Sequence, residues 1–96
     1  MLVEWEDRAT RDVRNIYEYL AERNGRAAIR IRNAIFAHAA ILATHPEVGR
    51  RGGWPGSREL AVSRTQYILV YEIEPDTDVV RILRVFHGAQ YRPEEL

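Results

Sequence analysis

The stretch G-S-R-E-L-A-V-S-R-T-Q-Y-I-L-V-Y-E-I-E-P-D-T-D-V-V-R-I-L-R-V-F-H, from Gly56 to His87, decides the fold of this chain. It contains three runs rich in aliphatic and aromatic residues, at Arg58 to Val62, Tyr67 to Ile73 and Val79 to His87. Val, Ile, Tyr and Phe favour a pleated, packed surface, whereas the polar segments between the runs supply turn residues. The stretch therefore predicts an antiparallel meander of three strands.

The chain before this stretch has helical spacing. Leu2 to Trp5 is predicted to form a short edge strand, after which apolar residues recur every three or four positions. This period predicts an amphipathic helix from about Glu6 to Arg23. We expect Asn24-Gly25 to end this helix, because glycine tolerates the left-handed conformation that is common after a helix C-terminus.

A second helix is predicted from about Arg26 to Thr44, with Pro46 as the stop signal. Its alanines and isoleucines form one apolar stripe, which permits close packing. His38 borders this stripe, and we interpret it as a hydrogen-bonded packing residue, because a ligand or a base needs a convergent partner. The predicted fold is α+β: a short N-terminal strand and an antiparallel α-helical hairpin packed on a C-terminal three-stranded antiparallel meander.

Composition limits the possible functions. The 96 residues suffice for a single domain, residues 1–96, with a modest core. Cysteine is absent and the three histidines are scattered, so we expect no metal site and no cofactor. No apolar run approaches the roughly 20 residues that span a bilayer, and the acidic start M-L-V-E-W-E-D is unlike a secretory signal. We therefore expect a cytoplasmic protein without membrane contact.

Charge also carries information. The formal net charge is zero, which argues against binding nucleic acid by bulk electrostatics alone. All fourteen basic residues are arginines, whose planar fork of donors suits phosphate and carboxylate groups.

Alternation along the strands predicts two unlike sheet faces. In the middle strand, one face carries Tyr67, Leu69, Tyr71 and Ile73, and we expect it to meet the helices. In the last strand, Arg84 would be costly to bury without a partner.

We therefore place Leu83 and Val85 in the core and Arg84 on the opposite, open face. That open face would present Ile68, Val70, Ile82, Arg84 and Phe86. Small free monomers rarely expose so much apolar surface, which indicates a partner.

The loop H-P-E-V-G-R-R-G-G-W-P-G-S contains Arg50, Arg51 and Trp54. An aromatic residue among arginines suits stacking on bases or packing on a partner protein. Trp54 could equally cap the edge of the core, and the sequence leaves both interpretations open.

The fragments P-E-V-G-R, G-S-R-E-L, Y-I-L-V-Y-E-I and I-L-R-V-F-H-G-A-Q follow two helices in this order. In that arrangement they resemble the RelE/ParE superfamily of toxins from type II toxin-antitoxin modules, over Trp5 to about Pro93. The resemblance implies a toxin that forms a hetero-oligomer with a cognate antitoxin encoded beside it. The antitoxin's C-terminal segment would fill the open face and contact the five residues placed there.

The resemblance implies two possible activities. RelE-like members cut mRNA on the ribosome, which requires a base, an acid and cations around the phosphate. Here such a site would have to use Arg58, Arg84, His87 and Tyr91. ParE-like members carry no nuclease site and inhibit DNA gyrase.

Three features favour the ParE-like branch. Ile68 precedes Leu69-Val70-Tyr71, where mRNA-cleaving members commonly have an arginine, and Arg84 and His87 project from opposite faces of a regular strand. The I-L-R-V-x-H-G-A-Q cadence also resembles ParE. The resemblance to this branch thus implies a gyrase inhibitor, for which no catalytic residues are expected. Its candidate target-binding residues are Arg50, Arg51, Trp54, Arg58 and Arg64. A ribosome-dependent endoribonuclease and a degenerate member that only binds its antitoxin are the alternatives.

Overall fold

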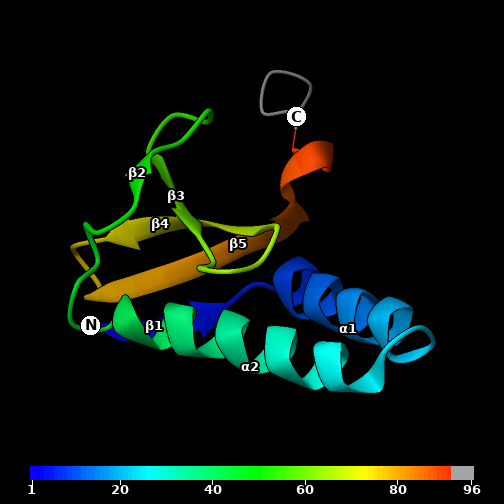
Figure 1. The fold of residues 1–96 in the computed structure, drawn as a ribbon. Coiled ribbons are helices and arrows are strands. Elements are labelled where there is room, and N and C mark those ends of the chain that lie inside the picture. Colours follow the sequence, from blue (N-terminus) through cyan, green and yellow to red (C-terminus); the bar gives the residue numbers. More distant parts are fainter. Residues whose placement is uncertain (92–96) are drawn as a thin grey trace.

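A mixed β-sheet forms the centre of the structure, and two helices cover one of its faces (Figure 1). The computed structural model describes residues 1–91. The elements are β1 (Leu2–Trp5), α1 (Asp7–Ala21), α2 (Gly25–Ile41), β2 (Arg50–Arg51), β3 (Ser57–Ala61), β4 (Tyr67–Glu74), β5 (Val79–His87) and the 3-10 helix η1 (Gly88–Gln90). The strand order is β1-β5-β4-β3-β2, in which β1 runs parallel to β5 and the other neighbours are antiparallel.

This arrangement confirms the predicted α+β fold, with a helical hairpin on a three-stranded meander. The sheet extends beyond the meander because β1 pairs with β5 and β2 pairs with β3. Over residues 1–91, neither helix has the length and apolarity needed to cross a membrane.

The junction between the helices differs from the prediction. α1 ends at Ala21, and Asn24 caps α2 by accepting a hydrogen bond from the backbone N–H of Ala27 at 3.1 Å. Gly25 is therefore the first residue of α2, and among the described glycines only Gly56 has a positive φ. The predicted left-handed stop at Gly25 is wrong, since the Asn24 side chain already satisfies a free N–H group at the start of α2.

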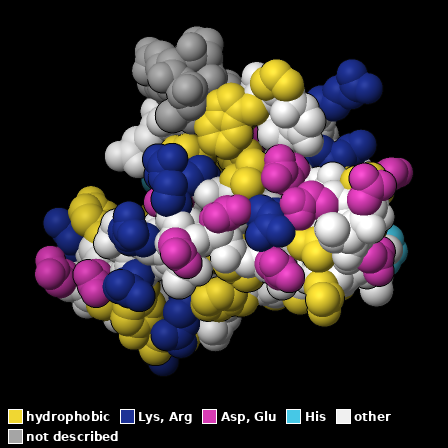
Figure 2. All heavy atoms as spheres, turned by 180° about the vertical axis from the view of Figure 1, so that it is seen from behind, with side chains coloured by type: hydrophobic (Ala, Val, Ile, Leu, Met, Phe, Trp, Pro, Cys, Tyr) yellow, Lys and Arg dark blue, Asp and Glu magenta, His cyan; other side chains and the backbone are white. Residues whose placement is uncertain are grey.

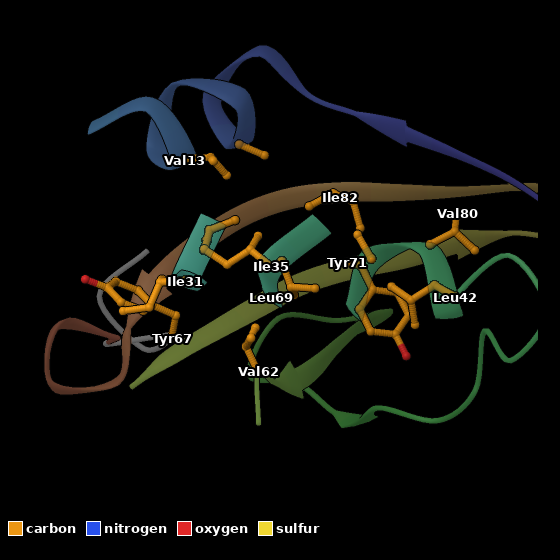
Figure 3. Packing of buried hydrophobic residues seen from close by; sticks show 13 residues of the cluster. Val13, Ile31, Ile35, Leu42, Val62, Tyr67, Leu69, Tyr71, Val80 and Ile82 are labelled. Atoms are coloured by element: carbon orange, nitrogen blue, oxygen red, sulfur yellow. The ribbon is translucent and has the colours of Figure 1, made fainter. Parts of the chain in front are cut away.

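The core lies between α2 and the sheet. Ile31 and Ile35 of α2 meet Leu69 and Tyr71 of β4, and Val13 joins them from α1 (Figure 3). The middle-strand residues Tyr67, Leu69 and Tyr71 are buried and Ile73 packs partly against them, which confirms their predicted face. Burying one such side chain stabilises the fold by roughly 1.5–3 kcal/mol.

A β-bulge in β5 corrects the prediction for the last strand. Tyr71 pairs with Ile82, whereas its neighbour Val70 pairs with Arg84, so Leu83 is an extra residue. Ile82 is fully buried in the core and Leu83 is only half-buried, so placing Leu83 in the core and Ile82 on the open face was wrong. The bulge resets the alternation, and Val85 is buried as expected.

Ion pairs around Arg81 join β1 to the sheet. Its guanidinium lies 2.8 Å from Glu74, 3.4 Å from Glu4 and 3.7 Å from Glu6. The hydrogen bond from Arg81 holds the pKa of Glu74 below its usual range. The short strand β1 is thus tied to β5 by charged side chains as well as by its backbone.

The bulge predicts unequal effects at two adjacent apolar positions. Ile82→Ala should lower the free energy of unfolding by about 2–5 kcal/mol, because it leaves a cavity in the core. Leu83→Ala should cost at most about 1.5 kcal/mol, since that side chain is only half-buried. Denaturant unfolding of both variants measures the difference, and equal losses, or a larger loss for Leu83→Ala, would contradict the observed register.

Candidate functional site

Asp12 of α1 closes the free edge of β5. β1 pairs only with Val79 to Ile82, so the second half of β5 has no neighbouring strand on that side. The Asp12 carboxylate accepts a hydrogen bond from the backbone N–H of Val85 at 2.9 Å. It also accepts two bonds from the Arg84 guanidinium, at 2.8 and 3.1 Å. This two-pronged charged contact fixes Arg84 against α1.

An aromatic cluster of Trp54, Phe86 and Tyr91 lies on the open face. The rings of Phe86 and Tyr91 stack with centroids 5.3 Å apart, and Trp54 meets both edge-on at 6.4 and 6.5 Å. The guanidinium carbon of Arg84 lies 4.5 Å from the centroid of the Phe86 ring. The chain's own loop and C-terminal segment therefore cover part of the face that we expected to be open.

A buried carboxylate lies beside this cluster. Glu59 is 7% exposed; it accepts a short hydrogen bond from the Tyr91 hydroxyl and pairs with Arg50 at 3.1 Å. Its neighbour across the sheet is Val70, which pairs in turn with Arg84. Tyr91 thus spans from Phe86 on β5 to Glu59 on β3 and crosses over β4.

This arrangement changes the proposed antitoxin surface. Val70 and Ile82 are both 0% exposed and present no surface to a partner, whereas Ile68 and Phe86 are half-buried and accessible. Ile82 was placed on the wrong face, and Val70 has the predicted orientation but lies beneath other side chains.

Local hydrogen bonds hold Trp54 in place. The Ser57 hydroxyl donates to the Trp54 carbonyl at 2.8 Å and accepts from the Trp54 N–H at 3.1 Å. Gly56 makes the turn between them with φ of +77°, a conformation that glycine adopts without a steric penalty. Trp54 is therefore held in a defined loop as a member of the aromatic cluster, and it does not pack against the hydrophobic core. Its packing on a partner stays a prediction.

Arg58 anchors the loop between α2 and β2. Its guanidinium donates to the backbone carbonyls of Gly49 and Glu47, at 2.8 and 3.3 Å. The buried Tyr71 hydroxyl donates to the Pro46 carbonyl at 2.7 Å and accepts from the Gly49 N–H at 2.9 Å. These contacts give Arg58 a structural role in positioning the loop.

A groove of about 840 Å³ runs between α1, the β3–β4 turn and the end of β5. Arg64, Arg84 and His87 line it. The Nδ1 atom of His87 accepts from the Ala89 N–H at 3.1 Å, so its Nε2–H donates to the Gln66 side chain at 2.6 Å. His87 is thus hydrogen-bonded at both ring nitrogens.

The four residues named for an endoribonuclease site do not converge. Arg84 and His87 line the same groove, but Arg58 is bound to the loop carbonyls and Tyr91 lies over the open face. Each of the four uses its polar group on a partner within the chain. Within residues 1–91, no three His, Asp or Glu side chains cluster closely enough to hold a metal ion.

The five residues predicted to bind the target lie in different parts of the structure. Arg50 and Trp54 lie beside the open face, whereas Arg64 lies in the β3–β4 turn at the groove. Arg51 is exposed on β2 and Arg58 is half-buried.

Sequence reasoning missed Asp12 and Glu59. For Asp12 a signal existed, since it lies three residues after Ala9 and four before Ile16 and so shares the apolar side of α1. For Glu59 the sequence held no comparable signal, because its partners Arg50 and Tyr91 meet it only through the fold. His38 has the predicted packing role: its Nδ1–H donates to Ala34 at 2.7 Å, and Nε2 accepts from Ser63 at 3.0 Å.

The model of a family described as ParE toxin of type II toxin-antitoxin system, parDE, matches residues 3–91. The chain belongs to this toxin family. The match confirms the resemblance to the RelE/ParE superfamily. The toxin is 37% identical to toxin RelE3 of Caulobacter vibrioides over 92 residues, covering 94% of this chain and 97% of the relative. It is 34% identical to the protein Y4kP of Sinorhizobium fredii over 94 residues, covering 98% and 95%.

Solved structures share the fold of the toxin. The chromosomal ParDE system from P. aeruginosa matches with a TM-score of 0.80 and 22% identity, over 91% of this chain and 95% of the other. The toxin-antitoxin complex RelBE2 from Mycobacterium tuberculosis matches with a TM-score of 0.67 and 27% identity, over 90% and 95%.

The contact between Gly49 and Tyr71 predicts a steric effect. A Cβ atom at Gly49 would lie 2.5 Å from the Tyr71 hydroxyl oxygen and 2.6 Å from the Glu59 carbonyl oxygen. Gly49→Ala should therefore lower the free energy of unfolding by about 1–3 kcal/mol. At Gly25 nothing lies within 4 Å, so the control Gly25→Ala should be neutral or stabilise the helix by about 0.5–1 kcal/mol. Chemical denaturation compares the two, and equal stabilities would contradict the tight contact.

We expect the ionisation of Tyr91 to make the stability of the protein depend on alkaline pH. Burial, and then the hydrogen bond to Glu59, raises the pKa of Tyr91 above 10.0. The stabilisation is complete below the unfolded pKa of about 10 and is lost as the pH rises through the folded pKa. Tyr91→Phe removes this ionisation and should reduce the alkaline loss of stability, measured by urea unfolding from neutral pH upwards. Part of the loss should remain, because burial also raises the pKa of Tyr67 and of Tyr71.

The matched control is Tyr17→Phe, in the helical hairpin and outside the cluster. Its alkaline profile should follow that of the wild type. If Tyr91→Phe also follows the wild type, the contact between Tyr91 and Glu59 does not contribute to stability.

Proposed function

We propose that this toxin arrests growth by binding a protein, DNA gyrase, and that it cleaves no RNA. The main support for the proposal is that each candidate catalytic residue is hydrogen-bonded to a different group of the chain. Arg58 binds the Gly49 carbonyl and Arg84 binds Asp12. His87 binds Gln66 and Tyr91 binds Glu59. In-line cleavage of RNA needs a base, an acid and cations around one phosphate. The charge of Arg84 is balanced by Asp12, which weakens it as a phosphate ligand.

The open face supports the same proposal. A phosphate approaching Tyr91 would meet the buried carboxylate of Glu59 and the half-buried side chain of Ile68. A carboxylate repels phosphate, and neither side chain offers a cation. The nearby cations are Arg50, whose guanidinium pairs with Glu59, and Arg84, whose guanidinium pairs with Asp12.

We further propose that a cognate antitoxin neutralises the toxin. Two of the similar structures, ParDE and RelBE2, are a toxin-antitoxin system and a toxin-antitoxin complex. The antitoxin segment would lie over Ile68 and Phe86 beside Arg84, on the accessible part of the open face. The Arg50 side chain lies on the same face and is 78% exposed, so it can pair with a carboxylate of such a segment as well as with Glu59.

Two assays of the purified protein test the target. The toxin should inhibit DNA supercoiling by gyrase and should leave mRNA on translating ribosomes intact. His87→Ala should keep its inhibition of gyrase and its arrest of growth within about twofold, because His87 contacts only residues of its own chain, Gln66, Tyr67 and Ala89, and has no part in the proposed binding. Ribosome-dependent cleavage that disappears in His87→Ala would instead establish the endoribonuclease. A wild-type chain that leaves growth unaffected without antitoxin would identify a member that has lost toxicity.

A further inference from the structure

The helix α2 is apolar on two sides. Ile31 and Ile35 face the sheet and are buried, whereas Ile29 and Phe36 face outward and are 47% and 46% exposed. A helix that covers a sheet from one side normally carries a single apolar stripe. The second apolar side of α2 therefore needs another explanation than the core.

A preformed cleft lies along this outer side, between α1 and α2. Its volume is about 440 Å³, which is enough for a large apolar side chain of a partner. We call it the hairpin cleft; it is lined by Trp5, Thr10, Val13, Arg14, Tyr17, Arg32 and Phe36. The rings of Trp5 and Phe36 meet edge-on at 5.3 Å, and the guanidinium of Arg32 lies 4.8 Å from the centroid of the Tyr17 ring. These ring contacts hold the walls of the cleft in place.

The charges around the cleft are unbalanced. Arg14 and Arg32 border it, and neither forms an ion pair with a carboxylate within residues 1–91. In the sheet, Arg50, Arg81 and Arg84 pair with carboxylates, whereas Arg58 donates to backbone carbonyls. An apolar cleft between unpaired arginines fits an acidic partner with an apolar anchor residue.

Arginines are also numerous over the rest of the hairpin. Residues 7–41 contain seven arginines and four acidic residues, and one of those acids, Asp12, is already bound to Arg84. Figure 2 shows the helices from behind, in the lower part of the view, where hydrophobic side chains lie among basic ones. The excess positive charge would steer an acidic partner towards the hairpin cleft.

The cleft lies on the other side of the molecule from the proposed antitoxin surface. The helices cover one face of the sheet, and Ile68 and Phe86 belong to the opposite face (Figure 1). An antitoxin segment on the open face would therefore leave the hairpin cleft free. This separation favours the target, and not the antitoxin, as the occupant of the cleft.

We propose that the hairpin cleft is the surface by which the toxin docks on its protein target, and that the target presents a large apolar side chain flanked by carboxylates. This inference rests on the proposed function in one respect, that the toxin acts by binding a protein. It does not depend on the target being gyrase.

The experiment compares charge-matched variants. Arg14→Glu with Arg32→Glu reverses both arginines at the cleft, and Phe36→Ala removes an apolar wall. The control, Arg8→Glu with Arg30→Glu, makes the same charge change at two exposed positions of the hairpin outside the cleft. Growth arrest after expression without antitoxin, inhibition of purified gyrase, and thermal unfolding are measured for each. Affinity for the purified product of the neighbouring antitoxin gene is measured as well, with Phe86→Glu as the variant expected to lose it.

Both cleft variants should weaken growth arrest and gyrase inhibition roughly tenfold or more, with antitoxin affinity unchanged. Their thermal stability should fall only slightly, because each loses one ring contact of a partly exposed side chain. The control variant should stay close to the wild type. If the wild type arrests growth without inhibiting gyrase while the cleft variants lose the arrest, the gyrase target fails and the docking surface stands.

Three results overturn the inference. One is growth arrest that persists in the cleft variants. Another is an equal loss in the control variant, which would assign the effect to net charge. A third is a parallel loss of antitoxin affinity in the cleft variants, which would make the antitoxin the occupant of the cleft.

Discussion

The bulge in β5, held by Asp12, is the constraint on which the rest of the structure depends. The extra residue Leu83 changes the alternation of the strand between Ile82 and Arg84. Asp12 binds both the Arg84 guanidinium and the next backbone N–H, so α1 holds the bulge at the point where β1 ends. The core on one side of this point and the open face on the other therefore both depend on one carboxylate.

Breaking this contact would be costly. Removal of one partner of a partly buried ion pair leaves the other charge without compensation, which typically costs several kcal/mol in a buried site. The side chains of Arg84 and Asp12 are 19% and 15% exposed, so solvent offers them little alternative hydration. Arg84 is consequently a structural residue of the open face before it is a ligand for any partner.

Much of the fold was accessible from the sequence because its signals are local. The strand from Val79 to His87 was predicted with its observed bounds, and the helical hairpin followed from apolar periodicity. The face of Ile82 was not accessible, because a two-residue period does not reveal an inserted residue. Asn24-Gly25 combines a helix-capping residue with a residue that often ends helices. In the structure Asn24 caps the start of α2, and Gly25 does not end α1.

The candidate site was harder to predict, since it depends on contacts between distant segments. Trp54, Glu59 and Tyr91 come together only because the loop before β3 and the segment after β5 fold over the same face. Periodicity does not report such contacts. The expected exposure of Val70 failed for this reason, although its orientation in the sheet was right.

The parallel pairing of β1 with β5 determines when the protein can fold during its synthesis. Glu4 and Arg81 are in contact although 77 positions separate them, and β5 lies between β1 and β4 inside the sheet. The inner strand β5 is thus synthesised after the other strands of the sheet. Pairing β1 with β5 closes a loop that contains the rest of the fold, so it should be slow compared with formation of the local hairpins. A nascent chain still lacking its last strand has neither the bulge nor the assembled core. A chain without β5 therefore cannot form the native sheet, because both β1 and β4 pair with that strand.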